Sequence, residues 1–193
     1  VNTVFEDCTV QGLVSGTTAS GGLLGTMSGG SAEGCSSNAV VTGTSYSGGL
    51  IGEVSGTFNI IDCRSDGSVT VIGTENYIGG FIGFVSCLLG EINDCDAYSD
   101  VGAPDSSSVG GFLGQYAGSS TSLEINNSAA YGDVSGNNDV GGFAGIIVSD
   151  VIAGVELKNT CSISDMIEGT MGVGGFAGTL DGTQSIVISE SYA

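Results

Sequence analysis

Histidine and tryptophan are missing from this 193-residue sequence, proline occurs once, and the only basic residues are Arg64 and Lys158. Without histidine, a zinc site of the H-E-x-x-H type cannot exist. The 21 acidic residues give a net charge of −19, which repels nucleic-acid phosphates and anionic lipids. The sequence therefore predicts neither nucleic-acid binding nor membrane-surface binding.

Long hydrophobic runs are missing too, because no stretch of about 18 consecutive apolar residues occurs. The most apolar stretch, residues 146–155, is interrupted by Asp150, so we predict no membrane insertion. The chain begins with Val1 rather than methionine, and no basic segment precedes an apolar one. These features predict a processed or excised piece of a longer protein.

Glycine is abundant instead, with 36 residues, while 40% of the chain is hydrophobic, which favours a packed fold over disorder. Six similar hexapeptides recur: SGGLLG from residue 20, SGGLIG from 47, IGGFIG from 78, VGGFLG from 109, VGGFAG from 140 and VGGFAG from 173. A fixed period of this kind is typical of a repeat architecture. The period is too short for propeller blades, which need about 40 residues.

Two further sets of residues recur with the same period. We call such a set of equivalent positions in successive repeats a column. One holds Phe5, Ala32, Ile60, Ile92, Ile125, Leu157 and Ile188, and the other holds Val14, Val41, Val71, Val101, Val134 and Ile167. Each repeat thus offers three segments of five or six residues rich in valine, isoleucine, phenylalanine and threonine, separated by turn residues. We predict an all-β fold, a right-handed parallel β-solenoid of about six coils, each with about 31 residues and three short strands.

The whole chain, residues 1–193, is predicted to be a single repeat domain. Its coils start near residues 4, 32, 60, 92, 125 and 157, and a final strand covers 186–193. We expect the apolar residue after each Gly-Gly pair to stack into one ladder, comprising Leu23, Leu50, Phe81, Phe112, Phe143 and Phe176. The glycines would allow close backbone approach where a Cβ would clash.

Five of the six cysteines are predicted to form a thiol column: Cys8, Cys35, Cys63, Cys95 and, one place out of register, Cys161. Serine and threonine replace cysteine in the later repeats, which favours buried thiols packing as small hydrophobes. One or more disulfides remain an alternative. A zinc site is disfavoured, because ligand cysteines come in close pairs.

Acidic residues form columns as well, namely Glu91, Glu124 and Glu156, and Asp100, Asp133 and Asp165. They predict either a water-screened acidic face or, as the alternative, oxygen ligands for calcium. A third column, with Asp7, Asp62, Asp94, Asn127 and Asn159, could be read as catalytic carboxylates. Its repetition favours turn caps instead, so we predict no catalytic site, no cofactor and no enzyme.

Two smaller features concern binding. Tyr98 and Tyr131 occupy equivalent positions, and they either pack or form a platform for sugar rings. Asn126, followed by Asn127 and Ser128, is a candidate glycosylation acceptor.

The segments INDCDAYSDV (92–101), INNSAAYGDVSG (125–136) and ISESYA (188–193), with their VGGFLG and VGGFAG partners, resemble the GLUG motif. The resemblance covers essentially the whole chain, although four units have Phe where the motif prefers Leu. It implies large secreted or surface-anchored bacterial or archaeal proteins, including adhesins and non-catalytic regions of IgA-specific metallo-endopeptidases. That peptidase chemistry does not carry over, since histidine is absent.

We therefore expect an extracellular or cell-surface structural or adhesive module, either a stalk segment or a subunit stacking end to end into a fibre. Its expected partners are further copies of itself or neighbouring repeats of a longer chain, with glycans or host and cell-surface proteins as other candidates. The alternatives are a carbohydrate-binding or carbohydrate-active β-helix and a calcium-dependent adhesin module. The carbohydrate alternative requires the connections 103–108 or 148–154 to converge beside Asp or Tyr residues.

Overall fold

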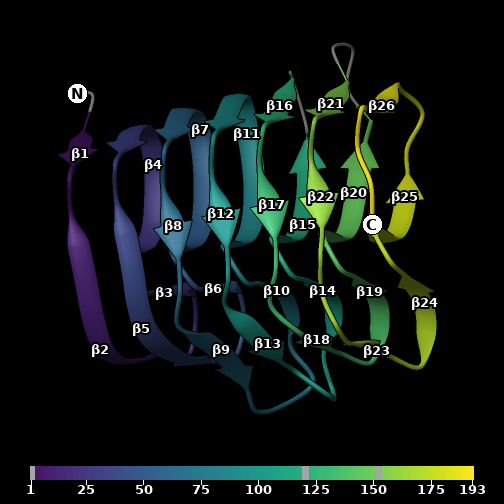
Figure 1. The fold of residues 1–193 in the computed structure, drawn as a ribbon, viewed down its shortest axis with the longest axis horizontal. Coiled ribbons are helices and arrows are strands. Elements are labelled where there is room, and N and C mark those ends of the chain that lie inside the picture. The colour runs from purple at the N-terminus through teal and green to yellow at the C-terminus, as the bar shows by residue number, and fades with distance from the viewer. Residues whose placement is uncertain (1–2, 119–121, 151–153) are drawn as a thin grey trace.

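The computed structural model describes residues 3–118, 122–150 and 154–193, and this part of the chain contains strands and turns but no helix. Every strand pairing is parallel, and successive coils stack along one axis with the N-terminus at one end and the C-terminus near the other (Figure 1). The all-β fold of about six coils with a spacing near 31 residues is confirmed. No helix that could cross a membrane is found in the described residues.

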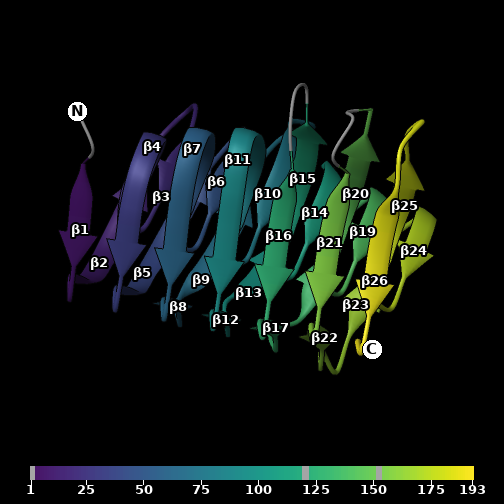
Figure 2. The same cartoon turned by 90° about the horizontal axis from the view of Figure 1, so that it is seen from above.

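Three parallel sheets form the faces of the solenoid. Sheet C contains β3 (Ser20–Gly21), β6 (Ser47–Gly48), β10 (Asn76–Gly79), β14 (Ser107–Gly110), β19 (Asn138–Gly141) and β24 (Met171–Gly174). Sheet A contains β1 (Val4–Glu6), β4 (Leu24–Glu33), β7 (Ile51–Ile61), β11 (Ile82–Asn93), β15 (Leu113–Gly118), β16 (Leu123–Asn126), β20 (Ala144–Ser149), β21 (Val155–Lys158), β25 (Ala177–Asp181) and β26 (Ile186–Ser189). Figure 2 shows the strands of sheet A side by side.

Sheet B contains β2 (Thr9–Ser15), β5 (Ser36–Gly43), β8 (Arg64–Ser65), β9 (Ser68–Val71), β12 (Asp96–Ala97), β13 (Asp100–Gly102), β17 (Ala129–Ala130), β18 (Val134–Ser135), β22 (Cys161–Ser162) and β23 (Ile167–Glu168). The chain passes from sheet C to sheet A, then to sheet B, and back to sheet C one coil further along.

The register of the sheets follows the sequence repeat. In sheet C, Ile78 pairs with Val109, and Val140 pairs with Val173. In sheet A, Ile60 pairs with Ile92, which pairs with Ile125 on its other side. Equivalent residues of successive repeats are therefore direct neighbours along the axis.

Strand lengths differ from the expected five or six residues. The strands of sheet C have two to four residues, whereas β4, β7 and β11 have 10, 11 and 12. The long strands stay continuous because they absorb a register shift, for example between Cys87 and Leu89. Such bulges bend a strand without ending it.

One column of the sequence pattern was wrong by two residues. In sheet B, Val41 pairs with Val69, and Val69 pairs with Val101, whereas Val71 pairs with Gly43. Because side chains alternate along a strand, a shift of two residues leaves both valines on the same face. Val69 and Val71 are accordingly both buried.

The core fills the space between the sheets. Leu50, Phe81, Phe112 and Phe143 are fully buried, and Leu23 and Phe176 at the two ends are half-buried against the same cluster. The stacked rings of Phe81, Phe112, Phe143 and Phe176 follow one another with centroids 4.6 to 5.0 Å apart. The column therefore forms a continuous ladder along the axis.

The Gly-Gly pair before each ladder residue lies where the backbone turns from sheet C to sheet A. A Cβ on Gly79 would overlap the carbonyl oxygen of Ile82, and one on Gly80 would overlap the carbonyl oxygen of Gly111 in the next coil. The pair recurs because the turn brings backbone atoms closer than a side chain permits.

Candidate functional site

The thiol column lies at the corner between sheets A and B and is hydrogen-bonded along the axis. The N–H of Cys35 donates to Cys63 Sγ, and the N–H of Cys63 donates to Cys95 Sγ, both at 3.4 Å. The N–H of Cys95 donates to Ser128 Oγ at 3.2 Å. Each of these thiols also donates to the carbonyl two residues earlier, as Cys95 does to Asn93 at 3.2 Å. The column thus satisfies backbone groups at a buried corner.

All six cysteines are free thiols in this structure. The grouping of Cys161 with the column is wrong, because Thr160 occupies the corner position and its N–H donates to Ser191 Oγ at 3.1 Å. Cys161 instead pairs with Ala129 on sheet B. The one-place offset in the sequence was the signal for this different position.

The residue before each cysteine, serine or threonine of the corner adopts a left-handed backbone conformation. Asp62, Asp94, Asn127 and Asn159 have φ between 49° and 57°, a conformation that Asn and Asp tolerate better than most residues. The Asn127 amide donates to Asp94 Oδ1 at 3.2 Å, and the Asn159 amide donates to Asn127 Oδ1 at 2.8 Å. These side chains therefore form a ladder that fixes the corner.

The candidate acceptor Asn126 lies at the end of β16, and its side-chain amide donates to Asn93 Oδ1 at 3.0 Å. Ser128, the other residue that defines the acceptor pattern, is buried and donates to the Asn126 carbonyl at 2.8 Å. The structure therefore places both residues inside coil-to-coil contacts.

The acidic columns lie on the outer faces. Glu91 pairs with Glu124, which pairs with Glu156, so three carboxylates stand on adjacent strands of sheet A. On sheet B the N–H of Asp133 donates to Asp100 Oδ1 at 3.0 Å. The N–H of Met166 donates to Asp133 Oδ1 at 2.9 Å, so Met166, rather than the expected Asp165, continues this column. Among the described residues, no three acidic or cysteine side chains lie close enough to hold a metal ion.

Tyr98 and Tyr131 lie side by side on the outer face of sheet B, with parallel rings 4.3 Å apart. The Arg64 guanidinium covers the other side of the Tyr98 ring at 4.0 Å and is paired with Asp66. The repeat pattern did not predict that Arg64 stacks on Tyr98, because this contact involves a basic residue that occurs in one coil only.

A second aromatic group was not expected from the sequence. Tyr46 and Tyr77 stack at 5.3 Å, and both contact Phe84, with centroids 5.3 and 5.2 Å away. Both tyrosines have positive φ, 47° and 74°, which is unusual for bulky residues. Ring contacts between adjacent coils offset this backbone strain.

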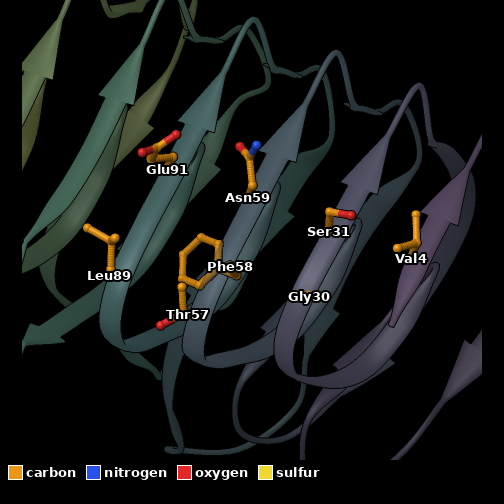
Figure 3. A pocket seen from close by; sticks show the side chains of 8 residues that line it. All are labelled: Val4, Gly30, Ser31, Thr57, Phe58, Asn59, Leu89 and Glu91. Atoms are coloured by element: carbon orange, nitrogen blue, oxygen red, sulfur yellow. The ribbon is translucent and has the colours of Figure 1, made fainter. Parts of the chain in front are cut away.

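A shallow groove of about 320 Å³ crosses sheet A near the N-terminal end. Figure 3 shows its lining side chains on successive strands, with Asn59 beside Glu91 and the Phe58 ring near Leu89. Gly30 has a positive φ, and a Cβ at this position would overlap the backbone carbonyl oxygen of Thr3. The lining combines apolar side chains, uncharged polar side chains and a single carboxylate, Glu91.

The connections named in the carbohydrate alternative lie between different pairs of strands. Residues 103–108 lead from β13 of sheet B into β14 of sheet C, whereas residues 148–154 begin in β20 and precede β21, both of sheet A. The centre of the second connection, residues 151–153, lies outside the described residues.

Residues 43–70 match the family model of the GLUG motif, which confirms the resemblance in the sequence. The matched segment runs from the end of β5 through β6, β7 and β8 to β9 and corresponds to one coil. No curated protein and no solved structure matches the chain.

Proposed function

We propose that this protein is an extracellular or cell-surface structural module. It acts as a stalk segment or as a subunit that stacks end to end with further coils, and it is not an enzyme. The GLUG motif and the β-solenoid fold of the chain support the proposal. One observation carries the proposal, which is that a coil buries its apolar columns only where a further coil covers it.

The contrast is largest in the apolar columns. Val140 is fully buried, whereas its pairing partner Val173 in the last coil is 45% exposed. Ile147 is fully buried, whereas its pairing partner Leu180 is 47% exposed. These side chains occupy the positions of core residues, so a further coil, of the same chain or of another copy, would bury them. Burying such side chains contributes about 1.5–3 kcal/mol each.

The backbone supports the same conclusion. Within the described residues, β1, β2 and β3 at one end pair on one side only, as do β24, β25 and β26 at the other. An unpaired strand edge is a template for further pairing. Because all strands are parallel, the last coil of one module can receive a first coil without a change of direction. Such a head-to-tail contact does not close and builds a filament.

Charge and side-chain use fit this role. The cysteine, asparagine and serine columns make contacts from coil to coil and so hold the axis together. The net charge of −19 keeps the sides of neighbouring solenoids apart. Association is therefore favoured at the ends over the sides.

Negative-stain electron microscopy of the purified chain at micromolar concentration tests the proposal. We expect rods whose length increases with concentration while their width stays that of one solenoid. Particles that remain one solenoid long at every concentration, or that widen by lateral clustering, would contradict end-to-end stacking.

A second candidate, a calcium-dependent form of this module, rests on the adjacent carboxylates of Glu91, Glu124 and Glu156. Like charges on neighbouring strands destabilise a sheet. A divalent cation between two neighbouring carboxylates would relieve the repulsion without a site of three protein ligands, which the described residues do not form. Calcium should then raise the melting temperature of the wild type and raise it less in Glu124→Gln. Equal melting temperatures in calcium and in chelator would remove this candidate.

A further inference from the structure

A small hollow opens on the outer face of sheet B, and we call it the tyrosine hollow. It has a volume of about 180 Å³ and is lined by Asp96, Asn127, Ser128, Ala129, Tyr131, Asn159, Cys161 and Tyr192. Unlike the ladders, it is not repeated along the axis, because its residues differ from coil to coil.

The register explains why the hollow exists. Asp96, Ala129 and Cys161 occupy equivalent positions on successive strands, and Cys161 is bridged to Tyr192. The two middle positions hold small side chains, while the outer two hold larger ones. Ala129 and Cys161 therefore form a floor that is bounded along the axis by Asp96 and Tyr192.

The other two sides carry different chemistry. The corner ladder supplies Asn127 and Asn159 on one side of the hollow. Tyr131 lies on the opposite side, and its ring stacks on that of Tyr98 with the centroids 4.3 Å apart. Tyr192 lies beside Cys161, to which it is joined by a parallel β-bridge. Two phenol rings thus border one hollow together with amide and carboxylate groups.

Hydrogen-bonding capacity is left over after the ladder is made. A side-chain amide has two N–H donors, and Asn127 and Asn159 each use one of them in the ladder. The ladder ends at Asn159, because the equivalent residue in the next coil is Glu190, whose carboxylate cannot donate. The ladder therefore supplies no donor to Asn159 Oδ1.

The charge of the hollow is negative. Asp96 is its one acidic lining residue, and both basic residues of the chain are paired outside it: Arg64 with Asp66 and Tyr98, and Lys158, which precedes Asn159, with Glu190 at 3.9 Å. Burial raises the pKa of Asp96 above its usual value, and Arg64 opposes this shift. Burial, with the nearby Asp96 charge, raises the pKa of Tyr131 to about 12, so its phenol keeps its proton at neutral pH.

We propose that the tyrosine hollow binds one pyranose ring of an uncharged sugar. A pyranose presents an apolar C–H face, which packs on a phenol ring, and hydroxyl groups, which both donate and accept hydrogen bonds. Asp96 accepts from hydroxyls, and the Asn127 and Asn159 amides donate to them. The hollow is smaller than the roughly 300–1,000 Å³ of pockets for drug-sized ligands, which suits a single ring.

The lining also predicts which ligands are rejected. Uronic acids and sulfated sugars bring a negative charge beside Asp96, and no lining side chain is basic. A quaternary ammonium ion would use the phenol rings and the carboxylate but would leave the amide donors unpaired. The site goes beyond the structural role, since a stalk needs no single hollow of this kind.

The test is an NMR titration of the ¹⁵N-labelled chain with glucose, galactose, mannose and N-acetylglucosamine. We expect at least one of them to bind with a millimolar Kd and to shift the side-chain amide signals of Asn127 and Asn159. Tyr131→Ala should weaken binding about tenfold or more, whereas Tyr131→Phe should retain it. Tyr77→Ala, which removes a stacked tyrosine elsewhere, is the matched control and should leave binding unchanged.

Asp96→Asn separates a specific site from general stickiness. It should weaken neutral-sugar binding and allow galacturonate to bind, because the repelling charge is gone. Failure of all four neutral sugars to shift these signals would overturn the proposal. So would binding of galacturonate or choline to the wild type as tightly as any neutral sugar, or full binding by Tyr131→Ala.

Discussion

The rings of Phe112 and Phe143 stack with their centroids 4.8 Å apart and their planes within 4° of parallel. This spacing equals the separation of neighbouring strands, which is about 4.7–4.9 Å. Side-chain stacking and backbone pairing therefore have the same period along the axis. A residue that fits one coil fits every coil, which explains why the hexapeptide is repeated.

Phe112→Ala should lower the free energy of unfolding by about 3–5 kcal/mol, because it removes a fully buried ring that stacks on both sides. Phe112→Leu should cost less, since Leu50 occupies the same column. Urea denaturation followed by circular dichroism measures both. Ile72→Ala, at a position 76% exposed, is the control and should change the free energy by less than about 0.5 kcal/mol. Equal costs for Phe112→Ala and Ile72→Ala would refute the ladder.

Gly80→Ala should destabilise the protein strongly, because the added Cβ would overlap the Gly111 carbonyl oxygen of the next coil. Gly102→Ala is the matched control, since a Cβ there meets no atom within 4 Å. Thermal melting of the two variants compares a close backbone approach with an open position. If the two variants melted alike, the steric explanation of the Gly-Gly pair would be wrong.

Cys95→Ser should be tolerated, because Ser128 performs the same hydrogen bonding in the next coil. Cys95→Ala should cost about 1–3 kcal/mol, since it leaves the buried N–H of Cys63 without its acceptor. Chemical denaturation under reducing conditions measures the difference between the two variants. An alanine variant as stable as the serine variant would show that the column only fills space.

Alkaline pH should destabilise the fold through its buried thiols. Burial raises the pKa of Cys35 and of Cys87 from 9.0 to about 11. A folded-state pKa above the unfolded one gives stability that is complete below pH 9 and is lost as the pH rises toward 11. Stability measured from pH 8 to 11 should therefore fall, and fall less steeply in Cys35→Ser. Parallel profiles for the two proteins would contradict this origin of the pH dependence.

The fold could be predicted from the sequence because a solenoid repeats its contacts. Many residues lie next to the equivalent residues of the neighbouring coils, so the repeat period alone was enough to align them. Examples are Gly79, Gly80, the ladder residue Phe81 and the corner residue Asp94. The alignment slipped at Val71 because alternation hides a shift of two residues, and it slipped at Asp165 and Cys161 by one. Which residues are equivalent at those positions is determined by strand pairing in the sheet, and it cannot be read from the residue types.

The tyrosine hollow could be predicted only in part. The sequence showed that Tyr98 and Tyr131 occupy equivalent positions. It did not show the floor of the hollow, which exists because Ala129 and Cys161 are smaller than the residues on either side of them along the axis. No role for Arg64 followed from the sequence, although its guanidinium covers the Tyr98 ring. Features that occur once in a repeat protein have no period, so three-dimensional neighbours are needed to find them.

The central claim is that the exposed last coil is a docking end for further coils. Sedimentation velocity over a concentration series tests it most directly, on the wild type, Leu180→Lys and Ile72→Lys. Leu180 lies in the open last coil, whereas Ile72 is an equally apolar, exposed residue between β9 and β10 in the middle of the solenoid. We predict that the wild type and Ile72→Lys associate with rising concentration while Leu180→Lys stays monomeric. A monomeric wild type, or association that Leu180→Lys leaves intact, would contradict the claim.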